Sequence, residues 1–320
     1  MEMVEHTLDV RGPRVSDGRR SPSAIGCVLS WVEPLVGETV SMAFRYTSRE
    51  RGRRPAWLVA ATTVRFADMS PGEGFTRLHF EGPRLGEAAE EPYRQGELFV
   101  TRPAPTDTAF DLVGDVVQDI LRGERNSCRF DARLLGRIER LSRAPAHWGV
   151  KSIALHGDRL PEEGPIELDA RVSQLAKGLR TAIPHPVRAR VAGKLDMIRA
   201  SDGSFGMLLE SGETVYGVLA ADGTRLLRDL WNTPVVVEGQ ATFRPSGSLL
   251  CMEAEGMAPA TEADRFFAKV PKARAVDLAP LPVRTTRRQT PATGAGAIYG
   301  RWPGDETEEE LLAALKEANQ

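Results

Sequence analysis

The 320-residue chain has few of the features that mark several large classes of protein. Its three cysteines, Cys27, Cys128 and Cys251, lie far apart, so they form neither a metal-binding spacing nor an even set for disulfides. The N-terminus lacks a basic-then-apolar signal pattern. No apolar run approaches the roughly 18 residues that a membrane-spanning helix needs. We therefore expect a cytoplasmic protein with no membrane partner.

The chain also has a small net charge and lacks the common catalytic motifs. The 42 basic and 44 acidic residues leave a formal charge of −2, so no overall field indicates binding to nucleic acid or membrane. The chain has no nucleophile elbow, no phosphate-binding loop and no zinc-protease helix motif. Its histidines are scattered, and His156 with Asp158 is the nearest approach to a catalytic pair. We predict no catalytic residue, metal or cofactor; a hydrolase in the first part of the chain is a weakly supported alternative.

Four aspartates recur every fourth residue along one predicted helical region. A stripe of carboxylates can bind a divalent cation, but it more often forms a solvated helix face. The second interpretation is favoured here, with Arg122 relieving some of the repulsion. The four residues are Asp107, Asp111, Asp115 and Asp119.

Residues 1–158 have the pattern of a mixed α+β domain. Period-two alternation indicates strands, and apolar spacing of three and four indicates helices, without a regular βαβ rhythm. The apolar stretch from Ile25 to Val40 is interrupted by Pro34 and Gly37. Residues 159–184 are predicted to be a connector. The expected elements are strands at 7–10, 77–80 and 150–155 and helices at 109–121 and 131–142, the first ending at Gly123.

A polar, arginine-rich loop at residues 48–55 precedes Trp57. Together they would allow contact with a phosphate and a base. A solvated hairpin tip is the more common origin of such a charge run and is favoured here. The role of this first domain stays open at the level of the sequence.

Residues 185–259 predict a small β-barrel. Three strands, a short helix and two further strands follow one another, which is the order of an OB-like or SH3-like barrel. Turns at Asp202–Gly203 and Ser211–Gly212 separate the first three strands. Glycines after the strands permit the bulges and coiling that closure needs. Those glycines are Gly193, Gly206, Gly217 and Gly239.

The predicted barrel also carries the alternative function, which is nucleic-acid binding. Alternation along the first strand places Arg188 and Arg190 on one outer face, whereas Phe205 is expected in the core. OB-like barrels often bind single strands through a basic face with aromatic residues. The candidate nucleic-acid-binding residues are Arg188, Arg190, Lys194 and Arg244.

The last 61 residues change character, beginning with a proline- and arginine-rich linker at 260–297. Residues 298–320 then predict a tail in which a Trp-Pro-Gly turn leads into a capping box, Thr307 to Glu310, and a short helix with one leucine face. Such an element suits docking to another chain, although it can also fold back on its own domain. The candidate partner-binding residues are Arg301, Trp302, Pro303, Asp305, Leu311, Leu312 and Leu315, with Arg287 and Arg288 of the linker.

The sequence Ile298-Tyr299-Gly300-Arg301-Trp302-Pro303-Gly304-Asp305-Glu306-Thr307-Glu308-Glu309 resembles the C-terminal segments of bacterial antitoxin-like proteins that accompany PIN-domain ribonucleases. The resemblance covers about a dozen positions. It implies a toxin–antitoxin partner whose acidic, metal-holding site is blocked by a basic tail. This chain is longer than small antitoxins, and it has no evident ribbon-helix-helix or helix-turn-helix segment, which puts promoter autoregulation in doubt. The combined expectation is an α+β protein with a small β-barrel and an extended tail that ends in a short helix.

Overall fold

The computed structural model describes residues 2–13, 15, 21–49, 54–93, 103–147, 149–157, 165–199, 203–219 and 224–274, with the backbone alone for 142–147 and 224–226. The chain divides into two units, Met1–Leu278 and Ala279–Gln320. All of the second unit and the end of the predicted linker lie outside the described residues. So do the proposed docking residues Arg287, Arg288, Arg301, Trp302, Pro303, Asp305, Leu311, Leu312 and Leu315, and also Asp158.

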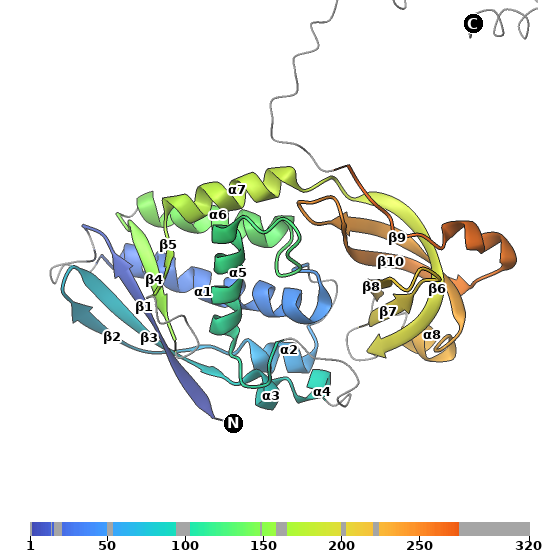
Figure 1. The fold of residues 1–320 in the computed structure, drawn as a ribbon. Helices are drawn as coiled ribbons and strands as arrows, with labels where there is room; N and C mark the ends of the chain where they lie inside the picture. Colours follow the sequence, from blue (N-terminus) through green and yellow to red (C-terminus); the bar gives the residue numbers. More distant parts are fainter. Residues whose placement is uncertain are drawn as a thin grey trace, which may run out of the picture. The chain divides into compact units, whose positions relative to one another are not determined.

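The first part of the chain contains a five-stranded antiparallel sheet with strand order β2-β3-β1-β4-β5 (Figure 1). β1 lies at its centre because it pairs with both β3 and β4. The strand expectations at 7–10, 77–80 and 150–155 are confirmed, although the third strand begins two residues late. The strands are β1 (Met3–Arg11), β2 (Arg65–Gly72), β3 (Phe75–Pro83), β4 (Ser152–His156) and β5 (Ile166–Leu168).

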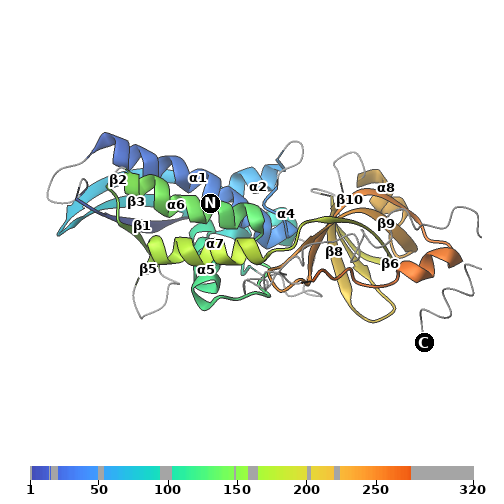
Figure 2. The same cartoon turned by 90° about the horizontal axis from the view of Figure 1, so that it is seen from above.

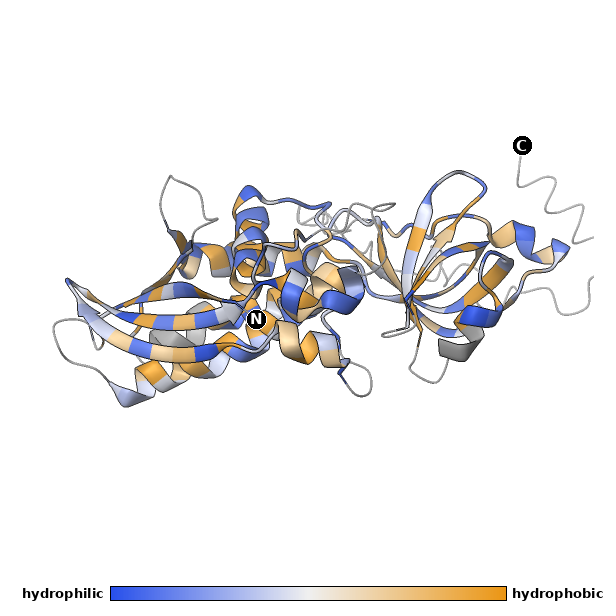
Figure 3. Cartoon of the chain, turned by 90° about the horizontal axis from the view of Figure 1, so that it is seen from below, coloured by the Kyte–Doolittle hydropathy of each residue, from blue (hydrophilic) through white to orange (hydrophobic). Residues whose placement is uncertain are grey.

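Alternation along β1 assigns the two faces of the sheet. Leu8 and Val10 are buried in the larger hydrophobic core, whereas Glu5 is exposed on the opposite face. The same alternation is visible along the neighbouring strands in Figure 3. Helices pack on the apolar face, and α6 and α7 lie side by side (Figures 1 and 2). These helices are α1 (Pro22–Arg45), α5 (Ala109–Arg122), α6 (Ala132–His147) and α7 (Ala170–Ala182).

Helices α5 and α6 confirm the helical spacing. Thr108 and Asp111 form a capping box at the start of α5, and Gly123 ends it with a φ of 66°. The apolar residues predicted for the core side of α6 are buried. They are Leu134, Leu135, Ile138 and Leu141.

Two segments between β1 and β2 differ from the sequence interpretation. The stretch broken by Pro34 is a single helix, α1, because its apolar residues at spacings of three and four bury one continuous face and Pro34 removes only one backbone donor. The residues after the arginine-rich loop form helix α2 (Ala56–Ala61) instead of a hairpin. Trp57 is 4% exposed and packs edge-on against Phe44, so its ring is not available for a base.

The predicted connector also proves to be part of the first fold. β5 pairs with β4, and α7 packs against α6 through the buried Val172 and Ala176. The sequence gives little sign of β5 because its three residues are too few to establish an alternating pattern. The remaining short helices are α3 (Leu85–Ala88) and α4 (Glu90–Tyr93).

The second fold is a closed barrel with strand order β10-β8-β7-β6-β9 (Figure 1). Neighbouring strands are antiparallel except for the parallel pair β8 and β10. The predicted order of three strands, a helix and two strands is confirmed, and Phe205 is fully buried. The elements are β6 (Val187–Arg199), β7 (Ser204–Leu208), β8 (Thr214–Leu219), α8 (Thr224–Asp229), β9 (Pro234–Phe243) and β10 (Leu249–Pro259).

Two of the predicted glycines are needed for strands to approach closely. A Cβ at Gly239 would lie 2.2 Å from the backbone oxygen of Glu253, and one at Gly217 would lie 2.7 Å from the backbone oxygen of Met252. After the barrel, Glu262–Phe267 forms a 3₁₀ helix that packs on β6, so the predicted linker begins with ordered structure. Within the described residues, no helix is long and apolar enough to cross a membrane.

Candidate functional site

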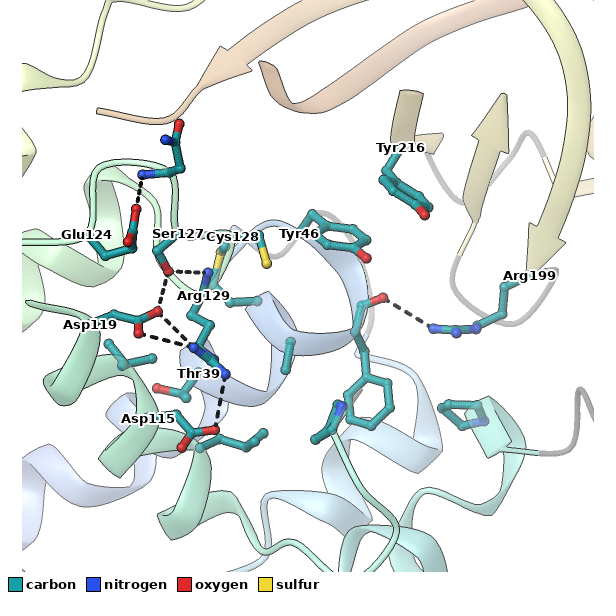
Figure 4. A pocket seen from close by; sticks show the side chains of 18 of the residues that line it. Thr39, Tyr46, Asp115, Asp119, Glu124, Ser127, Cys128, Arg129, Arg199 and Tyr216 are labelled. Atoms are coloured by element: carbon teal, nitrogen blue, oxygen red, sulfur yellow. Dashed lines mark hydrogen bonds and ion pairs between the residues drawn. The ribbon is translucent and has the colours of Figure 1, made fainter. Parts of the chain in front are cut away.

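The described residues enclose a cavity of about 690 Å³ where the C-terminal end of α1, the segment between α5 and α6, and strands β6 and β8 meet (Figure 4). All of these elements belong to the unit Met1–Leu278. A volume of this size is typical of sites for small organic ligands. The wall combines apolar residues with hydroxyl, carboxylate, guanidinium and thiol groups.

Direct contacts join the two folds around this cavity. The Arg125 guanidinium donates to the Pro245 carbonyl oxygen at 3.0 Å, and the Ser246 amide donates to the Arg125 carbonyl oxygen at 3.1 Å. Arg199 of β6 donates to the Phe44 carbonyl oxygen at the end of α1, at 3.3 Å (Figure 4). These hydrogen bonds hold the two folds together next to the cavity.

Two tyrosines stack at the junction between the two folds (Figure 4). The rings of Tyr46 and Tyr216 have centroids 4.7 Å apart and planes inclined by 26°. Tyr46 is the C-cap of α1 with a φ of 57°, a left-handed conformation that is uncommon for a bulky residue. Burial raises the pKa of Tyr46 to about 12, and Tyr216 acts in the same direction. Its hydroxyl is therefore protonated at neutral pH and can donate a hydrogen bond.

An arginine in the segment after α5 is held by two carboxylates. Arg129 donates to both carboxylate oxygens of Asp119 at 3.0 and 3.1 Å and forms an ion pair with Asp115 at 3.7 Å. The Ser127 hydroxyl donates to Asp119 at 2.7 Å. Yet the Arg129 side chain is 45% exposed, so this network fixes a charged donor at the cavity wall.

The expectation of a solvated aspartate face is wrong. Three of the four carboxylates are buried because each has a structural partner. Asp107 accepts from the Ala104 amide, Asp111 completes the capping box, and Asp119 pairs with Arg129. No cluster of three or more His, Cys, Asp or Glu side chains in the described part of the chain is placed to hold a metal ion.

Two further residues of the cavity wall are a threonine and a cysteine. Thr39 of α1 is 1% exposed, and its hydroxyl oxygen has no hydrogen-bond partner among the residues that the structure describes. Cys128 is exposed at the cavity, whereas Cys251 is buried, and burial raises the pKa of the Cys251 thiol. Cys128 is thus the accessible thiol of these two.

The four barrel residues proposed for nucleic acid are not brought into this cavity. Arg188 pairs with Glu255, and Arg190 pairs with Glu238 and contacts the Phe267 ring. Lys194 is exposed on β6, and Arg244 lies at the turn before β10, where it reaches the Ser248 hydroxyl at 3.4 Å. Arg188 and Arg190 therefore share an outer face, as predicted, but acidic neighbours offset their charge.

Two histidines, His79 and His156, have partners that the sequence does not indicate, on the sheet face opposite the hydrophobic core. His79 contacts the Ser70 hydroxyl at 2.9 Å and the Glu5 carboxylate at 2.8 Å. The Glu5 side chain is 66% exposed, so water screens this hydroxyl–imidazole–carboxylate chain. We interpret it as a cross-strand polar ladder and not as an activated nucleophile. Its members come from three strands, which no sequence spacing could indicate.

A second ladder on this face centres on Asp9, which accepts hydrogen bonds from Arg77 at 2.6 and 2.9 Å and contacts His156 at 2.8 Å. His156 thus pairs with Asp9, while Asp158 lies outside the described residues. Burial raises the pKa of the Asp9 carboxyl, but the hydrogen bonds and charges of Arg77 and His156 outweigh it, and the pKa lies below its ordinary value.

Replacing Asp9 by Asn should lower the free energy of unfolding by about 2 kcal/mol at neutral pH, because charge-assisted hydrogen bonds are lost. The folded-state pKa is depressed, so the carboxylate's contribution is complete above about pH 5 and is lost as the pH falls through that pKa. Urea denaturation between pH 2 and 7 measures this contribution. As a control, Glu5→Gln on the same strand should lower the free energy of unfolding by less than about 1 kcal/mol. If the difference in stability between wild type and Asp9→Asn does not shrink in acid, the ionised Asp9 carboxylate is not its source.

Comparisons with protein-family models, curated proteins and solved structures find no match to this chain.

Proposed function

We propose that this chain is a non-enzymatic, antitoxin-like protein that binds and inhibits a PIN-type ribonuclease through residues 298–320. The observation that carries the proposal is the tail sequence from Gly300 to Glu310, with its Trp-Pro-Gly turn and capping box. Arg287, Arg288 and Arg301 supply positive charge beside it. Such charge favours an acidic, metal-holding site and competes there with the phosphate of the substrate.

The folded part of the chain serves as a scaffold in this proposal. The two hydrophobic cores gather residues from Leu8 to Met257, and the first compact unit ends at Leu278. A chain shortened after Leu278 retains every residue of both cores. Removing the tail therefore separates partner binding from folding.

The test compares the full chain with the chain that ends at Leu278. The probe is the purified PIN-domain ribonuclease that this proposal expects to be encoded by a neighbouring reading frame, with affinity and inhibition of RNA cleavage as readouts. We expect binding and inhibition by the full chain, loss of both in the shortened chain, and equal melting temperatures. Equal binding by both chains would refute the role of the tail, and no binding by either would refute the partner.

A second candidate, nucleic-acid binding, is favoured by the topology of the barrel. The strand order, the parallel pair of third and fifth strands, and the helix between third and fourth strands are those of an OB-like barrel. Such barrels bind oligonucleotides on the face of the second and third strands, which are β7 and β8 here, and Tyr216 belongs to β8. Titration with single- and double-stranded oligonucleotides at low and moderate salt tests this function, using Arg188→Glu with Arg190→Glu as the variant of the outer basic face.

A further inference from the structure

We propose that the cavity between α1 and the barrel binds a nucleobase, presented either by a free nucleoside or by a single strand. This inference rests on the second candidate function and names its site. The proposed binding site is the cavity between the two folds, in place of the outer face of the barrel that carries Arg188 and Arg190. Four features of the wall support it: its aromatic rings, the backbone conformation at Tyr46, its balance of charge and its fixed arginine.

The aromatic rings provide a surface for a flat ligand. Tyr46 and Tyr216 both line the cavity and already stack on one another at a centroid distance of 4.7 Å. A planar base can extend this stack, and stacking on an aromatic side chain contributes about 1–3 kcal/mol per base. Phe44, Met42 and Met197 add apolar surface around the rings.

The backbone at Tyr46 indicates that the position of this ring matters. Glycine most often occupies the left-handed position that ends a helix, because a Cβ raises its energy. This chain instead has tyrosine there, with a φ of 57°. Strain of this kind concentrates at binding sites, where surrounding contacts hold it.

The charge of the wall discriminates between a base and a phosphate. Three carboxylates, Asp115, Asp119 and Glu124, and two guanidinium groups, Arg129 and Arg199, line the cavity. Because the three carboxylates outnumber the two guanidinium groups and Arg129 is paired with Asp119, the wall offers no excess positive charge to a dianion. A neutral, hydrogen-bonding ring fits better, and Arg129, fixed but 45% exposed, supplies directional donors.

The experiment is calorimetric titration of the full chain with adenosine, guanosine, cytidine and uridine, their 5′-monophosphates, and single-stranded oligonucleotides. We expect saturable binding of at least one nucleoside, with affinity that changes less than threefold between low and moderate salt. The monophosphate should bind no more tightly than its nucleoside. If the base comes from a strand, the oligonucleotide binds more tightly still and depends on the same residues.

The key variant is Tyr216→Ala, which should weaken binding at least tenfold, whereas Tyr216→Phe should change it less than threefold. Phe266→Ala is the matched control, since that ring lies outside the cavity and is 78% exposed. A bound base should also slow alkylation of Cys128, followed by mass spectrometry, and leave Cys27 unchanged. Near-equal melting temperatures of Tyr216→Ala and Tyr216→Phe check that the loss is not one of folding.

The outcomes separate the two proposals. Oligonucleotide binding that depends on Arg188 and Arg190, without nucleoside binding or sensitivity to Tyr216→Ala, would keep the second function and refute this site. No binding of any nucleoside or oligonucleotide would refute both. Nucleoside binding that survives Tyr216→Ala would place the base elsewhere and overturn the inference.

Discussion

Replacing Glu38 by Ala should destabilise the first fold by about 3 kcal/mol, the lower end of the range for breaking a buried ion pair. Glu38 of α1 is 4% exposed and joins α1 to α6. It accepts hydrogen bonds from Arg133 at 2.8 Å and from Arg137 at 2.7 and 2.6 Å. Without the carboxylate, Arg137, whose side chain is 20% exposed, keeps a charge that water reaches poorly.

The pKa of Glu38 indicates which effect dominates at this site. Burial raises the pKa of the carboxyl, yet the hydrogen bonds and charges of Arg137 and Arg133 outweigh it, and the pKa lies below its ordinary value. The ion-paired form is therefore the favoured form in the folded protein. Its stabilisation is complete above the unfolded-state pKa, about 4.3, and is lost as the pH falls through the folded-state pKa.

Urea denaturation at pH 7 measures the effect of Glu38→Ala. Glu33→Ala is the matched control, because Glu33 lies on the same helix and is exposed; a change within about 0.5 kcal/mol is expected there. The destabilisation by Glu38→Gln should lie between those of Glu38→Ala and Glu33→Ala, because glutamine retains the side-chain volume and loses the charge. A destabilisation by Glu38→Ala below about 1 kcal/mol would show that the pair contributes little beyond its own desolvation.

The parts of the fold that could be predicted from the sequence are those whose pattern is local. Helix α5 follows from apolar spacing and the glycine after it, and the barrel strands follow from alternation and the Gly203 and Gly212 turns. Helix α1 was missed because Pro34 is a strong local signal against a helix, whereas burial of a long apolar face decides the outcome. β5 was missed because three residues carry too little pattern.

The cavity could not be predicted from the sequence because no local pattern brings its residues together. Tyr46 ends α1, Arg129 follows α5, and Tyr216 belongs to the barrel. The regular spacing of Asp115 and Asp119 predicts a solvated helix face and gives no indication of Arg129 as their partner. Only the packing of the two folds places the two tyrosine rings and the arginine around one cavity.

Docking of the tail on a partner and folding of the tail back onto its own chain predict different effects of removing its aromatic side chain. An aromatic anchor buried in a partner's pocket often costs more than about 2 kcal/mol on truncation, or roughly a thirtyfold loss of affinity. Fold-back would instead make the same ring part of the stability of the chain itself. Truncating Trp302, the largest apolar side chain of the tail, therefore separates the two interpretations.

We expect Trp302→Ala to weaken binding of the full chain to the PIN-type ribonuclease at least thirtyfold, measured by calorimetry, with an unchanged melting temperature. Arg301→Ala should cause a smaller loss that shrinks at high salt, because an exposed charge contact is screened. Trp231→Ala is the control: that ring is 59% exposed on the barrel, and its loss should affect neither quantity. If Trp302→Ala instead lowers the melting temperature by several degrees, the tail packs on its own chain. Trp302 then stabilises the folded chain and is not an anchor for a partner.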